Sequence, residues 1–247
     1  HGAAARGAPG ARRRHGGGAP MKVSDAIAQR MSVRAFLADV PPAATVRSIL
    51  QAAARAPSGG NLQPWRVHAL AGAPLADLLA RVAAAPAQAP EYAVYPPSLW
   101  EPYRTRRFQN GEQLYASLGI AREDKAARLR QMARNATFFG APVGIFLSID
   151  ERMGAPQWAD LGCYLQNVLL LATEAGLATC PQEYWAFCSA PVKEFLGLGP
   201  GQTLFAGIAL GYANKAAPIN QWRTERAPFE EFAQLRGFAD EGAAPAP

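Results

Sequence analysis

The stretch TVRSILQAAARAPSGGNLQPWRVHAL, residues 45–70, determines the local organisation of the chain. Residues 45–56 place apolar side chains at intervals of three and four, which is the spacing of a helix that packs by one face. Pro57-Ser58-Gly59-Gly60 interrupts that pattern, because proline and glycine end helices. The β-branched and aromatic residues within 65–70 favour a strand. We therefore predict a helix, a turn and a strand in this order.

Helix and strand signals alternate through the rest of the chain. We predict helices at residues 75–85 and 158–175, and strands at residues 141–149 and 203–212. The helix at 158–175 is apolar on nearly all sides, so its burial comes from the chain's own core or from a second subunit. Gly176 follows it as a residue suited to a left-handed helix end.

The segment at about 86–137 departs from this alternation. Residues 86–107 are rich in proline and aromatic side chains, and residues 113–135 are charged and helix-prone. Because this segment interrupts the sheet pattern, we expect it to be lid-like and to cover a cleft. From residue 218 onward the chain is rich in proline, tryptophan and arginine, and we expect an extended arm.

The net charge of +6 comes mostly from the first 20 residues, which hold four arginines and no acid. Subtracting these four from the 25 basic residues leaves 21, against 19 acidic ones, over the other 227 residues. That balance gives no reason to expect binding to nucleic acid. The composition of residues 1–20 predicts a disordered basic tail, with an Arg-rich targeting peptide as the alternative. We expect Met21 to start a single folded domain over residues 21–238, and residues 239–247 to be a flexible C-terminus.

The sequence contains no motif typical of membrane, dinucleotide-binding Rossmann or metal-binding proteins. No run approaches the roughly 18 apolar residues of a membrane helix, and no Gly-x-Gly-x-x-Gly follows a strand as in a Rossmann domain. The three cysteines lack CxxC spacing, so we expect reduced thiols, a cytoplasmic location and no zinc knuckle. His68 is the only histidine beyond residue 20, and we predict a packed or edge position in a strand. A histidine metal site and a Ser-His-Asp triad are therefore disfavoured, and we expect no metal.

Three motifs carry groups suited to ligand binding. In an extended segment Arg30, Ser32 and Arg34 point to the same side, and two guanidiniums with a hydroxyl suit a phosphate. The turn at residues 56–65 presents backbone N–H groups, amide side chains and glycines that permit close approach of a planar ligand. The segment RTERAP at residues 223–228 is again cationic. Taken singly, these motifs are better explained by a solvated strand edge, an ordinary turn and a charged surface.

In this order and spacing the three motifs resemble the FMN-dependent nitroreductase family, over about residues 24–230. The Pro-Ser-Gly-Gly-Asn-Leu-Gln-Pro-Trp block is the most specific part of the resemblance. It implies an α+β fold with a central, mostly antiparallel sheet flanked by helices, in an intertwined homodimer with two FMN sites at the interface. It also implies a ping-pong reaction, in which hydride passes from transiently bound NAD(P)H to flavin N5 and the electrons then reduce a nitroaromatic or quinone-type acceptor.

The resemblance implies roles for individual residues. Arg30, Ser32 and Arg226 are the expected phosphate contacts, Arg34 is the cation near the flavin N1/O2 edge, and the backbone N–H of Glu183 is the N5 donor. No side chain is expected to be catalytic, because flavin N5 carries the chemistry. The remaining residues expected at the cofactor are Pro57, Ser58, Asn61, Gln63, Pro181, Gln182 and Arg223. Pro57 and Ser58 are expected to come from the opposite subunit.

The aromatic residues of the lid-like segment and its surroundings have two interpretations, as lid or interface core and as a surface that stacks on a flat substrate. The candidate substrate contacts are Trp100, Tyr103, Arg107, Phe138 and Tyr184. Arg104, Arg106 or Arg107 would meet a carboxylate or a nicotinamide phosphate. Two alternative functions stay open: a flavin oxidase or dehydrogenase of a natural metabolite, and a flavin-binding protein without turnover.

Overall fold

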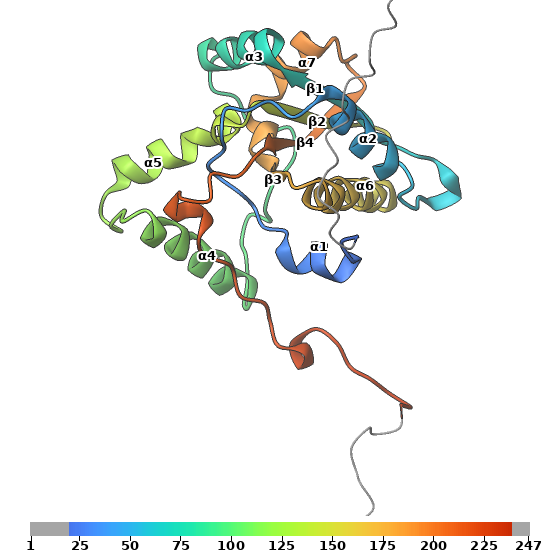
Figure 1. The fold of residues 1–247 in the computed structure, drawn as a ribbon, viewed down its shortest axis with the longest axis vertical. Helices are drawn as coiled ribbons and strands as arrows, with labels where there is room; N and C mark the ends of the chain where they lie inside the picture. The colour runs from blue at the N-terminus through green and yellow to red at the C-terminus, as the bar shows by residue number, and fades with distance from the viewer. Residues whose placement is uncertain (1–19, 239–247) are drawn as a thin grey trace, which may run out of the picture.

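Four strands form one antiparallel sheet within residues 20–238, the part of the chain that the computed structural model describes (Figure 1). Their order is β1 (Arg66–Ala71), β2 (Val143–Asp150), β4 (Gln202–Gly211) and β3 (Ala178–Gln182). The register pairs Ile145 with Ile208 across the two central strands, and a bulge shifts it between Leu147 and Ser148. The predicted disordered tail, apart from residue 20, and the predicted flexible C-terminus lie outside the described residues.

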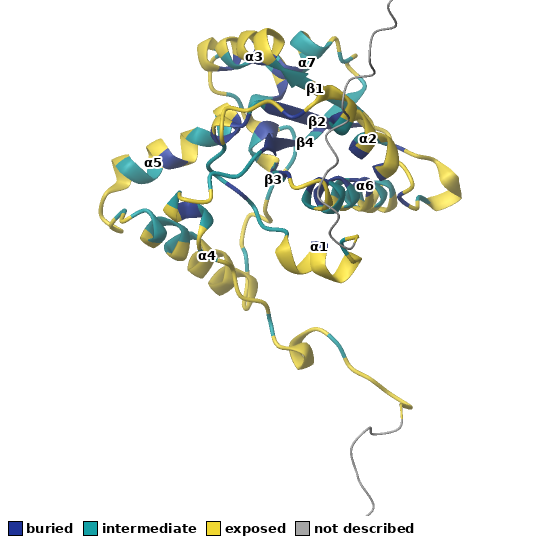
Figure 2. Cartoon of the chain, viewed as in Figure 1, coloured by how far each residue is buried: buried dark blue, intermediate teal, exposed yellow. Residues whose placement is uncertain are grey.

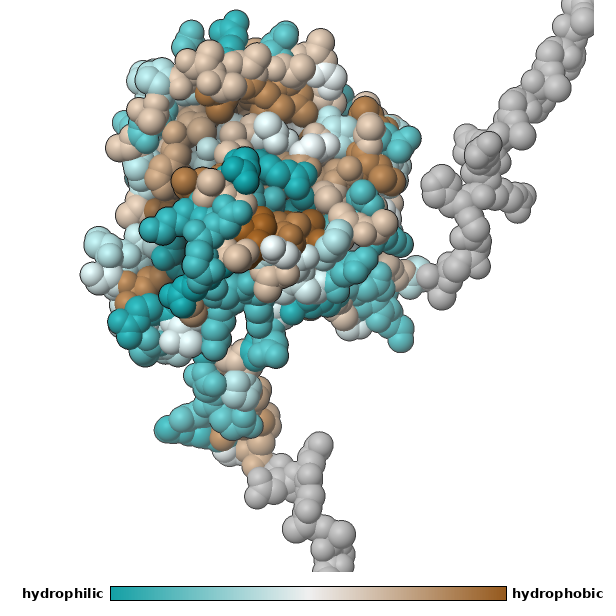
Figure 3. All heavy atoms as spheres, turned by 90° about the vertical axis from the view of Figure 1, so that its left-hand side faces the viewer, coloured by the Kyte–Doolittle hydropathy of each residue, from teal (hydrophilic) through white to brown (hydrophobic). Residues whose placement is uncertain are grey.

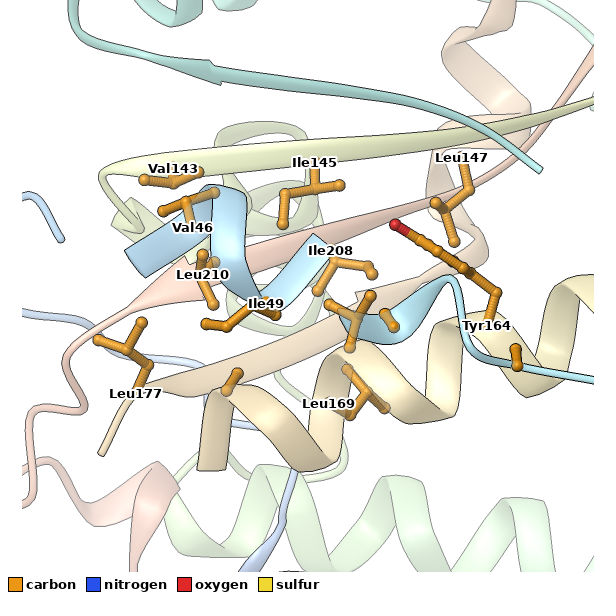
Figure 4. Packing of buried hydrophobic residues seen from close by; sticks show 14 of the residues in the cluster. Val46, Ile49, Val143, Ile145, Leu147, Tyr164, Leu169, Leu177, Ile208 and Leu210 are labelled. Carbon is orange, nitrogen blue, oxygen red and sulfur yellow. The ribbon is translucent and has the colours of Figure 1, made fainter. Parts of the chain in front are cut away.

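One face of the sheet is covered by α2 (Ala43–Ala53) and α6 (Ala155–Glu174). Alternate residues of β2, from Val143 to Ile149, point into this layer together with Ile208 and Leu210 of β4. Figure 4 shows them meeting side chains of α2 and α6. The hydroxyl of Tyr164 donates to the Leu50 carbonyl at 3.1 Å, which ties the two helices together.

The other face is covered by α3 (Gly72–Ala84), α7 (Ser189–Leu196) and the 3-10 segments η2 (Arg134–Gly140) and η3 (Glu183–Cys188). Its centre is an aromatic cluster in which the Phe138 and Trp185 rings lie 4.4 Å apart and both contact Phe146. β4 passes close beneath Trp185 at Gly207. A Cβ there would lie 2.2 Å from Trp185 Cδ1, so the packing requires glycine.

The remaining elements lie around this two-faced core. Helix α1 (Val23–Gln29) packs on α6, and the 3-10 turn η1 (Gly59–Asn61) follows α2. Helices α4 (Tyr103–Ser117) and α5 (Lys125–Ala133) project from the body and are largely exposed (Figures 1 and 2). The arm after β4 contains η4 (Pro218–Asn220) and η5 (Phe229–Glu231) and leaves the body as an extended chain.

The lid-like segment is attached to the body at its start. Glu91 pairs with Lys193 of α7 at 2.5 Å and accepts the N–H of Leu204 at 2.9 Å. The hydroxyl of Tyr92 donates to the Phe205 carbonyl on β4. These contacts hold the chain before α4, while α4 itself stays on the surface.

The predicted elements agree with the structure at α2, β1, α3, β2, α6 and β4 within a few residues. Gly176 has a φ of +73°, as expected for the residue that ends α6. His68 lies half-buried in the edge strand β1, where burial lowers its pKa. The prediction missed β3 and α7. No helix among residues 20–238 is both long and apolar enough to cross a membrane.

Candidate functional site

The segment after α1 runs extended beside β3, and four of its residues, including Met31, line one cavity. Ser32 bridges to Thr179, and the Val33 N–H donates to the Thr179 carbonyl at 2.9 Å. Val33 is buried, whereas Arg30, Ser32 and Arg34 line a cavity of about 240 Å³. The structure therefore brings the predicted triplet together at one cavity.

The C-terminal arm forms the opposite wall of this cavity, which we call the arginine cavity. Trp222, Arg223, Thr224 and Arg226 line it. Arg223 donates to the Arg30 carbonyl at 2.9 Å, and Arg226 donates to Thr224 Oγ1 at 2.6 Å. Two segments almost 200 residues apart thus meet at one place.

Asn220 holds the two walls together. Its Oδ1 accepts the Arg34 N–H at 2.9 Å, and its Nδ2 donates to the carbonyls of Ala35 at 2.8 Å and Asn214 at 2.9 Å. One side chain therefore fixes the backbone that carries Arg34. Asn110 of α4 completes the lining, so the lid-like segment also reaches the cavity.

The arginine cavity carries uncompensated positive charge. Four arginines line it, and no carboxylate is among the lining residues of the described chain. Burial, and after it the like charges of Arg226 and Arg223, lower the pKa of Arg30. The indole Nε1 of Trp222 is buried without a hydrogen-bond partner in the described chain. A dianionic phosphate would offset half of this charge and accept hydrogen bonds from the arginines, so this donor set fits the phosphate of FMN.

Strand β3 connects the arginine cavity to the predicted N5 donor. Cys180, beside Ser32, is fully buried, and burial raises the pKa of its thiol to about 11. From Thr179 the chain runs to Glu183, roughly 13 Å further at about 3.3 Å per residue. Gln182 is buried and donates from Nε2 to Asn135 Oδ1 at 2.9 Å. Pro181, Gln182 and Glu183 thus follow directly on the part of β3 that pairs with Ser32.

The turn at residues 57–63 has a well-defined conformation, but it does not line the arginine cavity. Gly60, Asn61 and Gln63 have positive φ, and the Ser58 hydroxyl accepts the Gln63 N–H at 3.0 Å. The Gly59 N–H donates to Asp160 near the start of α6 at 3.2 Å. Pro57, Asn61 and Gln63 are exposed.

The turn and the arginine cavity lie on different sides of one chain. Thr173 and Gly176 line a second cavity together with Arg30, which places the triplet near the end of α6. Asp160 and Thr173 are thirteen residues apart on α6, or roughly 20 Å at about 1.5 Å per residue. In Figure 1 the turn lies at the right-hand edge, whereas α4, which lines the arginine cavity, lies at lower left.

The candidate substrate contacts divide into three places. Trp100, Tyr103 and Arg107 line one surface pocket on the lid-like segment. Tyr184 is half-buried in η3, directly after Glu183. Phe138 does not join them: its ring is fully buried between Phe146 and Trp185, so it has no surface to offer a substrate.

Sequence reasoning missed Asn110, Asn220 and Trp222 as residues of the site. An asparagine in a polar helix or beside a proline turn gives no signal of its own, and Trp222 was visible only as part of the aromatic and basic arm. Among residues 20–238 no group of three or more His, Cys, Asp or Glu side chains is placed to hold a metal ion.

Comparisons with known proteins agree on one family. A model described as the nitroreductase family matches residues 27–212. The 4-nitrobenzoate reductase of Pseudomonas putida is 37% identical over 214 residues, covering 86% of this chain and 94% of the relative. The FMN- and NADPH-dependent nitroreductase NfnB from Sphigopyxis sp. strain HMH superposes with a TM-score of 0.85 at 47% identity, covering 88% of this chain and 100% of that chain. NfnB of Mycobacterium smegmatis, solved in complex with NADPH, gives a TM-score of 0.82 at 32% identity, covering 87% and 97%.

Proposed function

Because the chain belongs to the nitroreductase family, we propose that it is an FMN-dependent oxidoreductase that takes electrons from NAD(P)H and reduces nitroaromatic or quinone-type acceptors. The observation that carries this proposal is the arginine cavity, where four guanidiniums and the Ser32 hydroxyl converge without a carboxylate in the described lining. Such a set suits the terminal phosphate of a bound flavin.

Each part of the chain has a role toward the cofactor. FMN supplies the redox chemistry, and the protein supplies position and charge. Arg30, Ser32, Arg223 and Arg226 bind the phosphate. Arg34 places a cation where negative charge collects on reduction, which favours the reduced form. The backbone N–H of Glu183 donates toward N5, with Pro181 and Gln182 beside it.

We assign Pro57, Ser58, Asn61 and Gln63 to the same flavin site, supplied by the opposite subunit of an intertwined homodimer. The roughly 20 Å of α6 between the turn and the triplet supports this assignment, because one chain holds the two parts at opposite ends of a rigid helix. A twofold axis brings the turn of one chain to the arginine cavity of the other and creates two equivalent sites.

The C-terminal arm also supports a homodimer. Its apolar side chains are exposed in the isolated chain, namely Phe229, Phe232, Leu235 and Phe238. Large apolar side chains on an extended segment lose the stabilisation of burial unless another surface covers them. A second copy of the chain provides that surface. We also propose that residues 21–238 form a single domain.

We place the protein in the cytoplasm. The support is chemical: Cys163, Cys180 and Cys188 are all free, as is usual where thiols stay reduced.

The first test removes the phosphate contacts. The double variant Arg30→Ala/Ser32→Ala loses two hydrogen bonds to a charged group. FMN binding is expected to weaken by about 3 kcal/mol, which raises the Kd roughly a hundredfold. Titration of the FMN-free protein with FMN, followed by flavin fluorescence, measures this. Arg152→Ala, at a surface pair with Asp150, is the control and retains the wild-type Kd. An unchanged Kd in the double variant would show that the phosphate binds elsewhere.

The second test follows the reaction. NADPH added without oxygen bleaches the flavin of the purified protein, and a nitroarene added next restores its colour. Bleaching without recovery would indicate a natural metabolite or another acceptor, and no bleaching would indicate a flavin-binding protein. A protein that neither contains nor takes up FMN contradicts the proposed function.

A further inference from the structure

A surface pocket on the lid-like segment is lined almost wholly by ring and aliphatic side chains. The pocket has a volume of about 390 Å³. Its lining residues are Tyr95, Pro96, Leu99, Trp100 and Tyr103, together with Arg106 and Arg107. Small-molecule sites occupy roughly 300–1,000 Å³. The Trp100 and Tyr103 rings meet edge to face at 5.4 Å, and both are about half exposed or more. The walls therefore offer ring faces to a flat ligand.

Arg107 is the cation of this pocket that has no carboxylate partner. Three arginines lie within one turn of α4, and two of them are engaged: Arg104 pairs with Glu101 at 2.7 Å, and Arg106 pairs with Glu231 at 2.5 Å. Arg107 pairs with no acid in the described part of the chain. Its guanidinium lies over the Tyr95 ring at 4.3 Å, which holds it at the pocket with its donors free at the edges.

The pocket adjoins the proposed flavin site. Asn110, which lines the arginine cavity, lies three residues after Arg107 and so follows it by one turn on the same face of α4. Figure 3 views the side that carries α4 and α5, where hydrophilic side chains cover most of the lower half and apolar patches lie between them. A molecule in the pocket is thus one helical turn from the cavity that holds the flavin phosphate.

The geometry points to a subsite for a planar ring that carries an anionic substituent, with the ring against Trp100 and Tyr103 and the anion on Arg107. This inference rests on the proposed function, because it assigns a selectivity to the same reaction. Two ligands of that reaction have this chemistry: the 2′-phosphoadenosine end of NADPH and a nitroarene that bears a carboxylate.

The test compares anionic ligands with neutral or less charged partners of the same shape. The wild-type holoenzyme, Arg107→Gln and the control Arg104→Gln are prepared in parallel. The two variants lose the same charge from one helix, but Arg104 does not line the pocket. Binding is measured by calorimetry for 2′,5′-ADP against 5′-AMP, and for benzoate against benzamide. Turnover is measured for NADPH against NADH, and for 4-nitrobenzoate against 4-nitrobenzamide.

Arg107→Gln is expected to lower the preference for the anion about tenfold in one of the two pairs, because a charge-assisted hydrogen bond is weakened but not lost at an exposed site. If the preference for 2′,5′-ADP over 5′-AMP falls, the pocket binds the dinucleotide. If the preference for benzoate over benzamide falls, it binds the acceptor. Arg104→Gln keeps the wild-type preference. The subsite is refuted if Arg107→Gln changes neither ratio, or weakens charged and neutral partners equally. The binding arms need no electron transfer, so their result is separate from failure of the flavin to bleach.

Discussion

Replacing Gly207 by alanine tests the packing behind the predicted N5 donor. The new Cβ would lie 2.2 Å from Trp185 Cδ1, 2.4 Å from its Nε1 and 3.0 Å from Phe138 Cε1. Non-bonded carbon atoms settle at about 3.5–4.0 Å, so the indole has to move by roughly 1 Å or more. Trp185 is fully buried, with the rings of Phe138 and Phe146 at 4.4 and 5.0 Å, so its displacement disturbs both neighbours.

The expected loss in the free energy of unfolding is about 3 kcal/mol, at the upper end of the usual range for overpacking. That is a large part of a typical total of about 5–15 kcal/mol. Trp185 also follows Glu183 by two residues in η3, so its displacement moves the predicted N5 donor and weakens FMN binding. Stability and cofactor affinity therefore fall together.

Urea unfolding of the FMN-free protein measures the first effect, and FMN titration measures the second. Gly111→Ala in α4 is the control, because its Cβ meets nothing within 4 Å; it stabilises the protein by about 0.5–1 kcal/mol. Adding Trp185→Phe to Gly207→Ala relieves the clash, so the double variant loses less than the two single losses combined. An unchanged urea midpoint in Gly207→Ala, or strict additivity in the double variant, refutes the close packing of β4 on Trp185.

Two further substitutions probe the site and the core. Asn220→Ala leaves the Arg34 N–H without its acceptor and removes one of the two donors to each of the Ala35 and Asn214 carbonyls, which costs about 2 kcal/mol and weakens FMN binding. Urea unfolding and flavin titration measure the two effects, and wild-type values in both would contradict the role of Asn220. Burial raises the pKa of the Cys180 thiol from 9.0 to about 11. As the pH rises, the thiol therefore loses its proton in the unfolded chain before it does so in the folded chain. The free energy of unfolding falls between about pH 9 and pH 11, by at most about 1.4 kcal/mol per pH unit. Cys180→Ala should show a shallower fall between about pH 9 and pH 11, and identical slopes would exclude this linkage.

The fold was predictable wherever one residue spacing dominates. The periodicity of residues 45–56 and 158–175 located α2 and α6, because each helix buries an apolar side against the sheet. Strand β3, with the sequence ATCPQ, has no such spacing and contains a proline. It is extended because β4 and the segment around Ser32 pair with its two edges, and such non-local pairing overrides weak local preference.

The site was predictable where alternation in an extended chain places cations on one side. Arg30, Ser32 and Arg34 do line one cavity with Arg226, but the intervening Met31 lines it too, so alternation is only part of the reason. Phe138 shows the limit of such reasoning. An aromatic ring in a polar stretch gives the same signal whether it faces a ligand or the core, and only the packing of Phe146 and Trp185 around it decides the outcome.

The span of α6 has a genetic consequence. In the proposed twofold dimer each flavin site would take Arg30, Ser32 and Arg34 from one chain and the Ser58 turn from the other. A mixed dimer of one subunit damaged at Arg30 and one damaged at Asn61 gathers both lesions into a single site and leaves the other intact. Two alleles that are each inactive alone would then complement when they are expressed together, and two alleles with lesions in the same half would not.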